Sequence, residues 1–273
     1  MAHRDVTEKG PSFRSDQVDS GQIDMLVAIL DVQARLPGIQ RMRRWAHEAL
    51  AVQAGERALD IGSGTGSEAM AFAERVGADG EAVGIDPNSD MVALAERRAA
   101  EAGSTARYVG GSIYALPFPD GHFDAIRCER VYQHLDDPAA ATAEIARVLR
   151  PGGRVLLIDS DWYTSITHPG DPAVVRAVSE TLLTNTPNPG SGRRLRGQLV
   201  AEGLEIDDMG SEAVIWDPES ALPLYGEMTR RAVAAGAITA AQHDQFRADL
   251  DAGIAAGDYH LSVTMFAVLA HRR

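Results

Sequence analysis

Cysteine and long apolar segments are scarce in this chain. Cys128 is the only cysteine among 273 residues, which excludes an internal disulfide and a cluster of thiolate metal ligands. No apolar run approaches the ~20 residues that span a membrane. Residues 1–17 contain no stretch that resembles a signal peptide, and we expect them to form a flexible tail. These absences predict a cytoplasmic protein without a membrane contact.

Positive charge is also in short supply. The chain has 26 Lys and Arg residues against 39 Asp and Glu residues, which gives a formal net charge of −13. Nucleic-acid binding draws on clustered basic residues, so we expect no nucleic-acid partner. The eight histidines are scattered and show no H-x-x-x-H pattern, so we also expect no metal site.

Strands and helices alternate from residue 57 onward. Short apolar runs at 57–61, 81–86, 106–110, 123–128 and 154–159 indicate strands. Helical patterns fill 67–76, the stretch from Asn88 to Gly103, and 136–150. Such alternation is typical of an α/β fold in which helices cover both faces of a parallel sheet. Ligands of such sheets bind beyond the carboxyl ends of the strands.

The two ends of the chain depart from this alternation. Residues 18–50 predict two helices, separated at Pro37–Gly38. Toward the other end, a helix at 192–204 and a strand at 205–216 precede a helical stretch at 217–258, and 259–270 is the final strand. The helical stretch would interrupt the sheet between its last two strands and lie above the carboxyl-end face as a lid.

The segment "LDIGSGTGS" at 59–67 predicts a ligand-binding loop between the first strand and the first helix of the sheet. Its glycines follow G-x-G-x-G, whereas dinucleotide-binding proteins use G-x-G-x-x-G. Asp60 would repel a pyrophosphate but suits an ammonium group. Asp86 ends the second strand, where an acid can accept hydrogen bonds from two ribose hydroxyls or can cap the next helix. The pattern favours a nucleoside ligand over a dinucleotide, although a tight turn without a ligand also needs glycine.

Three segments are informative when taken together: "LDIGSGTGSEA", "GIDPNSDMVALAERRA" and "GGSIYALPFPDGHFDAIRCERVYQHLDDPAAATAEIARVLRPGGRVLL". They resemble class I S-adenosylmethionine-dependent methyltransferases of the small-molecule type, which include ubiquinone/menaquinone C-methyltransferases and the methyltransferase type 11 group. The resemblance covers residues 55–160. It implies a Rossmann-like seven-stranded sheet in the order 3-2-1-4-5-7-6, with the seventh strand antiparallel. It also implies a helical cover at 18–50 and a methyltransferase domain over 51–273, with the lid at about 217–258.

The resemblance implies S-adenosylmethionine as cofactor and S-adenosylhomocysteine as product. Methionine and ribose would lie on the glycine loop, the ribose hydroxyls on Asp86, and the adenine against Pro87 and Met91. The family usually has an acid in its third-strand motif, where this chain has Ser112. The cofactor residues implied are Asp60, Gly62, Ser63, Gly64, Thr65, Gly66, Asp86, Pro87, Met91, Gly111, Ser112, Ile113, Cys128 and Glu129.

Methyl transfer needs alignment and an activated nucleophile, and a general base assists when the acceptor is a hydroxyl or an enol-like carbon. His134 follows the fourth strand and titrates near neutrality, so it is a candidate base, with an architectural role as the alternative. Asp161 and Asp159 follow the fifth strand, where they would orient His134, bind substrate or cap the loop. We take His134 and Asp161 as the catalytic candidates.

Three further residues near these strand ends have two interpretations each. Arg130 would hold a substrate carboxylate or pair with a nearby acid. Trp162 and Tyr163 would form the wall of a pocket for a flat substrate or pack beneath the lid. The expected reaction is methylation of an O or C atom of a small organic acceptor, in secondary or quinone metabolism, by a monomer or homodimer. The alternatives are an NAD(P)-dependent oxidoreductase and a non-catalytic S-adenosylmethionine-binding protein.

Overall fold

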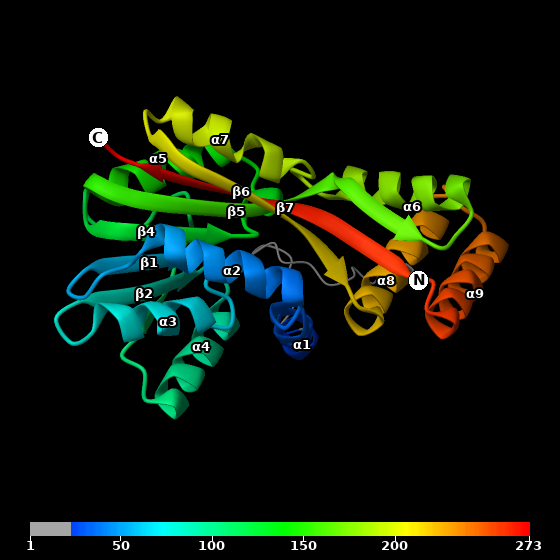
Figure 1. The fold of residues 1–273 in the computed structure, drawn as a ribbon, viewed down its shortest axis with the longest axis horizontal. Coiled ribbons are helices and arrows are strands. Elements are labelled where there is room, and N and C mark those ends of the chain that lie inside the picture. The colour runs from blue at the N-terminus through cyan, green and yellow to red at the C-terminus, as the bar shows by residue number, and fades with distance from the viewer. Residues whose placement is uncertain (1–22) are drawn as a thin grey trace, which may run out of the picture.

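The computed structural model describes residues 23–273, so the predicted tail at 1–17 and the start of the first predicted helix lie outside the described residues. Seven strands form one sheet in the order β3-β2-β1-β4-β5-β7-β6 (Figure 1). β7 is antiparallel to β5 and to β6, and the remaining pairs are parallel. The predicted strand order and the antiparallel seventh strand are confirmed. The strands are β1 Arg57–Ile61, β2 Glu81–Asp86, β3 Arg107–Gly110, β4 Phe123–Glu129, β5 Leu149–His168, β6 Glu205–Trp216 and β7 His260–His271.

Helices cover both faces of the sheet. In Figure 1, α2, α3 and α4 lie on one face, and α5 and α7 lie on the other. Side-chain caps mark the start of three helices: Asn88 caps α4, Asp137 caps α5, and Thr239 with Gln242 forms a capping box at α9. The helices are α1 Ile23–Ala34, α2 Pro37–Leu50, α3 Ser67–Val76, α4 Ser89–Ala102, α5 Pro138–Val148, α6 Pro172–Asn185, α7 Ser191–Ala201, α8 Pro218–Ala234 and α9 Ala240–Ala256.

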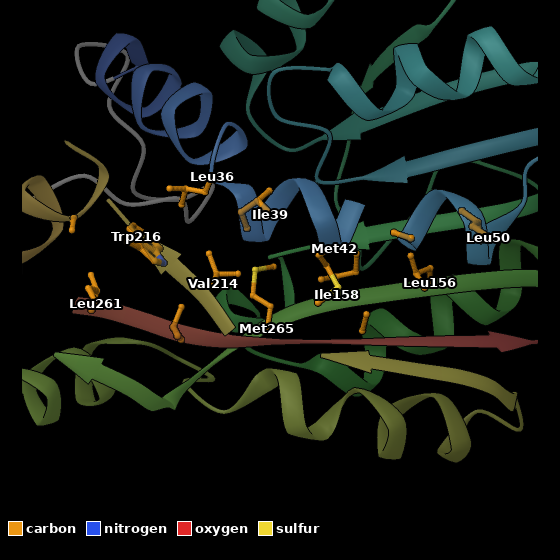
Figure 2. Close-up of a cluster of buried hydrophobic side chains, with 14 of the residues drawn as sticks. Leu36, Ile39, Met42, Leu50, Leu156, Ile158, Val214, Trp216, Leu261 and Met265 are labelled. Atoms are coloured by element: carbon orange, nitrogen blue, oxygen red, sulfur yellow. The ribbon is translucent and has the colours of Figure 1, made fainter. Parts of the chain in front are cut away.

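The second helix, α2, is fixed to the late strands of the sheet. The apolar stripe of α2, which includes Ile39 and Met42, packs on side chains of β5, β6 and β7 (Figure 2). This burial removes apolar surface from water and so stabilises the association. The helical cover predicted at 18–50 is thereby anchored to strands that come much later in the sequence. The residues labelled in Figure 2 are Leu36, Ile39, Met42, Leu50, Leu156, Ile158, Val214, Trp216, Leu261 and Met265.

The fifth strand is longer than predicted, and this changes the architecture. The apolar run at 154–159 predicts its centre, but β5 continues to His168 because β7 pairs with it over that distance. Ile166 lies opposite Ser262 in this extension. β5, β6 and β7 therefore project beyond the rest of the sheet and carry additional helices (Figure 1).

The helices on this projection include one that the sequence analysis did not identify. The stretch predicted as a lid at 217–258 forms α8 and α9, as expected. The additional helix is α6, whose start signals are the cap Asp171 and Pro172 in the first turn. α8 packs against α1, α6 and α9. The Tyr225 hydroxyl on α8 donates to Thr167 of the β5 extension at 3.0 Å, which ties the lid to the sheet.

Candidate active site

A continuous cavity of about 640 Å³ begins at the carboxyl ends of β1, β2 and β4, beside Ser160 and Trp162 of β5, and extends beneath α1, α6 and α8. We call the part against the strand ends the loop half; it includes residues 62–65, 86–88 and 111–114. The part beneath the helices is the lid half, formed by side chains such as Leu26, Trp162 and Met228. The cavity lies where an α/β sheet is expected to bind its ligand.

The glycine loop has the backbone that its sequence predicts. Gly62, Gly64 and Gly66 have φ of 71°, 48° and 87°, in the left-handed region that favours glycine. A Cβ at Gly62 would lie 2.4 Å from Cγ2 of Val131, so a side chain is also excluded by close packing. Residues 62–65 line the cavity, whereas Gly66 does not. The Tyr108 hydroxyl donates to the carbonyl of Gly66 at 2.7 Å, a support that the sequence analysis missed.

Asp86 lies beside this loop at the end of β2. Its Oδ2 accepts a hydrogen bond from the backbone of Gly64, and its Oδ1 accepts one from the backbone of Asn88, both at 2.9 Å. Asn88, and not Asp86, caps α4, because its side chain accepts from the backbone of Asp90 and Met91. Burial raises the pKa of Asp86. Since a carboxylate offers about four acceptor positions, Asp86 retains capacity for two ligand hydroxyls.

Other expected cofactor residues surround this carboxylate. Ser63 is buried and lines the loop half, and its hydroxyl has no hydrogen-bond partner among the described residues. A buried hydroxyl without a partner is costly, so the site fits a polar ligand that supplies one. The wall beside Asp86 is completed by Pro87, Met91, Gly111, Ser112 and Ile113.

A buried charged cluster forms the floor between β1 and β4. Nη1 of Arg127 lies 3.1 Å from Asp60, and Nη2 lies 3.4 Å from Glu68 and also pairs with Glu129. Arg43 of α2 contacts Glu68 and Glu129 at 3.2 Å each. Burial raises the pKa of Asp60 to about 7. At Glu68, Arg127, His47 and Arg43 together outweigh burial and lower the pKa to about 2. Burial thus disfavours the charged form of Asp60, whereas the neighbouring cations favour the charged form of Glu68.

The expected residue His134 lies in a turn that is fixed from two sides. The turn, η2 at Tyr132–His134, follows β4, and His134 lines the cavity. The Asp159 carboxylate accepts from the backbone of Gln133 at 3.0 Å, and the Gln133 side chain accepts from the Trp162 indole at 2.8 Å. Burial raises the pKa of Asp159 to about 7. Asp159 thus holds the turn in place and does not itself line the cavity.

Strand alternation keeps Cys128 away from the cavity. Successive side chains of a strand point to opposite faces. Arg127 and Glu129 line the cavity, and Cys128 between them is buried in the core on the α5 and α7 side. Burial raises the pKa of its thiol well above the ordinary value.

Asp161 is kept away from the cavity in the same way. Ser160 and Trp162 line the cavity, but Asp161 does not. Its carboxylate pairs with Arg193 of α7, whose Nη2 lies 2.9 Å from Oδ1. Tyr163 is exposed, with the Arg193 guanidinium 5.1 Å from its ring centroid, and it does not line the cavity. Trp162 alone of the two aromatic residues forms the wall that the sequence suggested.

The lid half is mainly apolar and aromatic. The rings of Trp162 and Trp216 lie 6.4 Å apart between centroids. Glu227 and Arg231 of α8 form an ion pair of 2.6 Å within this half. Its apolar lining side chains are Leu26, Leu30, Ala34, Trp162, Leu182, Trp216, Leu224 and Met228. The sequence analysis missed most of them, because they come from segments that only the tertiary fold brings together.

Two kinds of feature are absent from residues 23–273. No described helix is long and apolar enough to cross a membrane. No group of three or more His, Cys, Asp or Glu side chains among them is placed to hold a metal ion.

Comparisons with known proteins place this site in a family. Residues 59–157 match a family described as "Methyltransferase domain". The chain is 33% identical over 248 residues to an uncharacterized 37.1 kDa protein in transposon TN4556 of Streptomyces fradiae. The aligned region covers 89% of this chain and 70% of that protein. It is 29% identical over 228 residues to the ubiquinone/menaquinone biosynthesis C-methyltransferase UbiE of Hahella chejuensis. Here the aligned region covers 80% of this chain and 86% of that enzyme.

The extent of these matches varies, and a solved structure supports the fold. Three other curated relatives are matched over 61%, 42% and 58% of their own lengths. The crystal structure of the YcgJ protein of Bacillus subtilis is similar in fold, with a TM-score of 0.57, 24% identity, and coverage of 83% of this chain and 99% of that one. The family match, the relatives and the fold agree with the geometry of the loop half. The chain belongs to the class I S-adenosylmethionine-dependent methyltransferases.

Proposed function

We propose that this protein transfers the methyl group of S-adenosylmethionine to an O or C atom of a small, flat and largely apolar acceptor that binds in the lid half. The observation that carries this proposal is the continuity of the cavity between the glycine loop and the two tryptophans Trp162 and Trp216. Small-molecule sites are typically ~300–1,000 Å³ in volume. The cavity therefore has room for two neighbouring ligands of modest size.

In this proposal the loop half binds the cofactor. Asp86 accepts hydrogen bonds from the ribose hydroxyls, and Ser63 finds in the cofactor the partner that it lacks among the described residues. Glu129 lies at the methionine end, where its negative charge suits the cationic groups of the cofactor. When bound, S-adenosylmethionine supplies an electrophilic methyl group, whose bond to sulfur breaks as the bond to the acceptor forms.

His134 is the proposed general base. It lines the cavity at the carboxyl end of β4, on a turn that Asp159 fixes through the backbone of Gln133. A neutral imidazole there would accept the proton that an acceptor hydroxyl or enol-like carbon loses. Such a base acts only when it is aligned, and the rigid turn provides that alignment.

The acceptor class follows from the lid half and from the relatives. Apolar and aromatic side chains suit a flat ring system, and several relatives are named as ubiquinone/menaquinone biosynthesis C-methyltransferases. Both support an acceptor from quinone or secondary metabolism. The net charge of −13 argues against a nucleic-acid acceptor. We further propose that the protein acts in the cytoplasm as a monomer or homodimer.

Calorimetric titration of the purified protein with S-adenosylhomocysteine and, separately, with NADH tests the cofactor. We expect micromolar affinity for S-adenosylhomocysteine and no binding of NADH. Binding of NADH in its place would overturn the proposal in favour of an oxidoreductase. Methyl transfer to a panel of quinols and phenols then tests catalysis, and tight cofactor binding without turnover on any compound would favour a non-catalytic binding protein.

A further inference from the structure

Arg130 has a backbone conformation that arginine disfavours. Its φ is 57°, and it shares a positive φ with Ala51 alone among the non-glycine residues at 23–273. Arg130 directly follows β4, and its backbone N–H donates to the carbonyl of Ile158 at 2.8 Å, which holds this conformation. Strained backbone of this kind concentrates at functional sites, where it sets the direction of a side chain. Arg130 lines the cavity.

The guanidinium of Arg130 has few acceptors. Nη1 donates to the side chain of Gln33 on α1, which is neutral, and Nε lies 3.3 Å from Glu129. No residue in the described part of the chain accepts from Nη2. Glu129 also pairs with Arg43 and Arg127, so its single negative charge balances the positive charge of Arg130 only in part.

The three cavity arginines that contact Glu129, namely Arg43, Arg127 and Arg130, differ in how far their charge is balanced. Burial opposes the charged form of all three. For Arg127 the acids Glu68, Glu129 and Asp60 outweigh burial, and its pKa is raised. Arg43 is likewise raised, by Glu129 and Glu68. Only at Arg130 is the pKa lowered. There burial, together with repulsion from Arg43 and Arg127, outweighs the opposite effects of Glu129 and Asp159. Of the three guanidiniums, Arg130 would gain most from a further anion.

Arg130 also lies between the loop half and the lid half, where an anionic group of a bound acceptor would reach it. Through Gln33 it contacts α1, which lines the lid half, and through Glu129 it borders the loop half. The other cation in the lid half, Arg231, is already paired with Glu227 at 2.6 Å. The remaining lid-half walls that residues 23–273 provide are mainly apolar.

We propose that Arg130 binds an anionic oxygen of the methyl acceptor, a phenolate, enolate or carboxylate oxygen, and thereby selects acidic acceptors over their neutral analogues. This inference rests on the proposed function. A guanidinium presents paired N–H donors that match such oxygens and that form strong charge-assisted hydrogen bonds. The carboxylate of the cofactor has the same chemistry, and the experiment below distinguishes the two sources.

The test compares matched probes on protein saturated with S-adenosylhomocysteine. The acid and neutral pairs are 2-hydroxy- and 2-methoxy-1,4-naphthoquinone, 4-nitrophenol and 4-nitroanisole above the pKa of the phenol, and benzoate and benzamide. Each is titrated by calorimetry into the wild type, Arg130→Gln and Arg130→Asn. Asparagine tolerates the left-handed backbone, so the second variant removes the guanidinium without new strain. Arg230→Gln is the control, because this exposed arginine of α8 carries the same charge outside the cavity.

We expect the wild type to bind the anion of at least one pair tenfold or more tightly than its neutral partner. Both Arg130 variants should reduce this preference to less than threefold, while Arg230→Gln retains it and S-adenosylhomocysteine affinity stays within threefold in all proteins. Absence of any preference in the wild type, or a preference that survives in both Arg130 variants, would overturn the inference.

Two further outcomes separate the sources of the anion. A loss of S-adenosylhomocysteine affinity of tenfold or more in both folded Arg130 variants would assign the guanidinium to the cofactor carboxylate and also overturn the inference. Failure of the wild type to bind S-adenosylhomocysteine would remove the proposed function itself. Thermal melting of each variant shows that it is folded before titration.

Discussion

Oδ2 of Asp86 accepts a hydrogen bond from the backbone N–H of Gly64 at 2.9 Å, so the end of β2 and the glycine loop form one unit before any ligand arrives. The same carboxylate fixes the backbone of Asn88 through Oδ1. Its two roles, as a support for the loop and as the expected acceptor for ribose hydroxyls, lie on one buried side chain. Loss of the carboxylate should therefore affect binding more than loss of one ligand contact.

We expect Asp86→Ala to raise the dissociation constant of S-adenosylhomocysteine about 100-fold or more, because hydrogen bonds to a charged group contribute roughly 1.5–3 kcal/mol each. Calorimetry on the folded variant gives the measurement. Asp90→Ala, an exposed acid at the start of α4, is the matched control and should bind within twofold of the wild type. Equal affinity in Asp86→Ala and the wild type would remove the ribose assignment.

Gly62 requires glycine for two reasons, its positive φ and its close packing, and a comparison with Gly55 separates their contributions to stability. Gly55 has a similar φ of 81° with open space around its Cβ position, whereas a Cβ at Gly62 would lie 2.4 Å from Val131. We expect Gly55→Ala to lower the free energy of unfolding by about 1 kcal/mol through backbone strain alone. Gly62→Ala should cost about 1–3 kcal/mol more, from overpacking, and should weaken cofactor binding.

Urea denaturation of both variants measures this difference, and Gly62→Ala with Val131→Ala supplies the check. If packing against Val131 is the cause, the double variant should recover part of the stability that Gly62→Ala loses. Equal losses in Gly55→Ala and Gly62→Ala would mean that φ alone determines the need for glycine at position 62.

Most residues of the loop half could be predicted from the sequence, because they lie in short segments of consecutive residues. The G-x-G-x-G spacing, the acid at the end of the second strand and the order of the strands all follow from local patterns and the family resemblance. A two-residue period along β4 and β5 would also have placed Cys128 and Asp161 opposite to Glu129 and Trp162. Arg127, a charge inside an apolar strand, was the local signal of the buried cluster.

The lid half could not be derived in the same way. Its walls combine α1, α6 and α8 with the projecting ends of β5 and β6, and no short motif records that these segments meet. The extension of β5 depends on pairing with β7, about a hundred residues later, rather than on its own apolar run. The helix that was missed, α6, did leave a local signal, in Asp171–Pro172 and the apolar positions that follow.

Asp159 predicts a dependence of stability on pH. Burial raises its pKa from 3.8 to about 7 in the folded protein. Between those values the folded protein holds a proton that the unfolded chain has released, so stability falls as the pH rises from about 4 to 7. We expect the free energy of unfolding of Asp159→Asn, relative to the wild type, to increase over this range by as much as about 4 kcal/mol.

Urea denaturation at pH 4.5, 6.0 and 7.5 measures this trend, with exposed Asp79→Asn as the control. Asp60, whose pKa burial also raises to about 7, contributes a slope of the same sign that remains in the Asp159 variant. Parallel curves for Asp159→Asn and the wild type would show that Asp159 stays ionised in the folded protein.

The pair of Asp161 and Arg193 yields the last prediction. Asp161 is fully buried, and its carboxylate lies on the face of β5 away from the cavity, where it pairs with Arg193. We expect Asp161→Asn to lower the free energy of unfolding by about 1–3 kcal/mol and to leave S-adenosylhomocysteine affinity unchanged. A double-mutant cycle with Arg193→Met should give a coupling of roughly 0.5–3 kcal/mol, because each variant removes the same interaction. The matched cycle of Asp161→Asn with His134→Gln should show no coupling in stability. Coupling to His134, or a loss of cofactor affinity in Asp161→Asn, would instead return Asp161 to the active site as a residue that acts with His134.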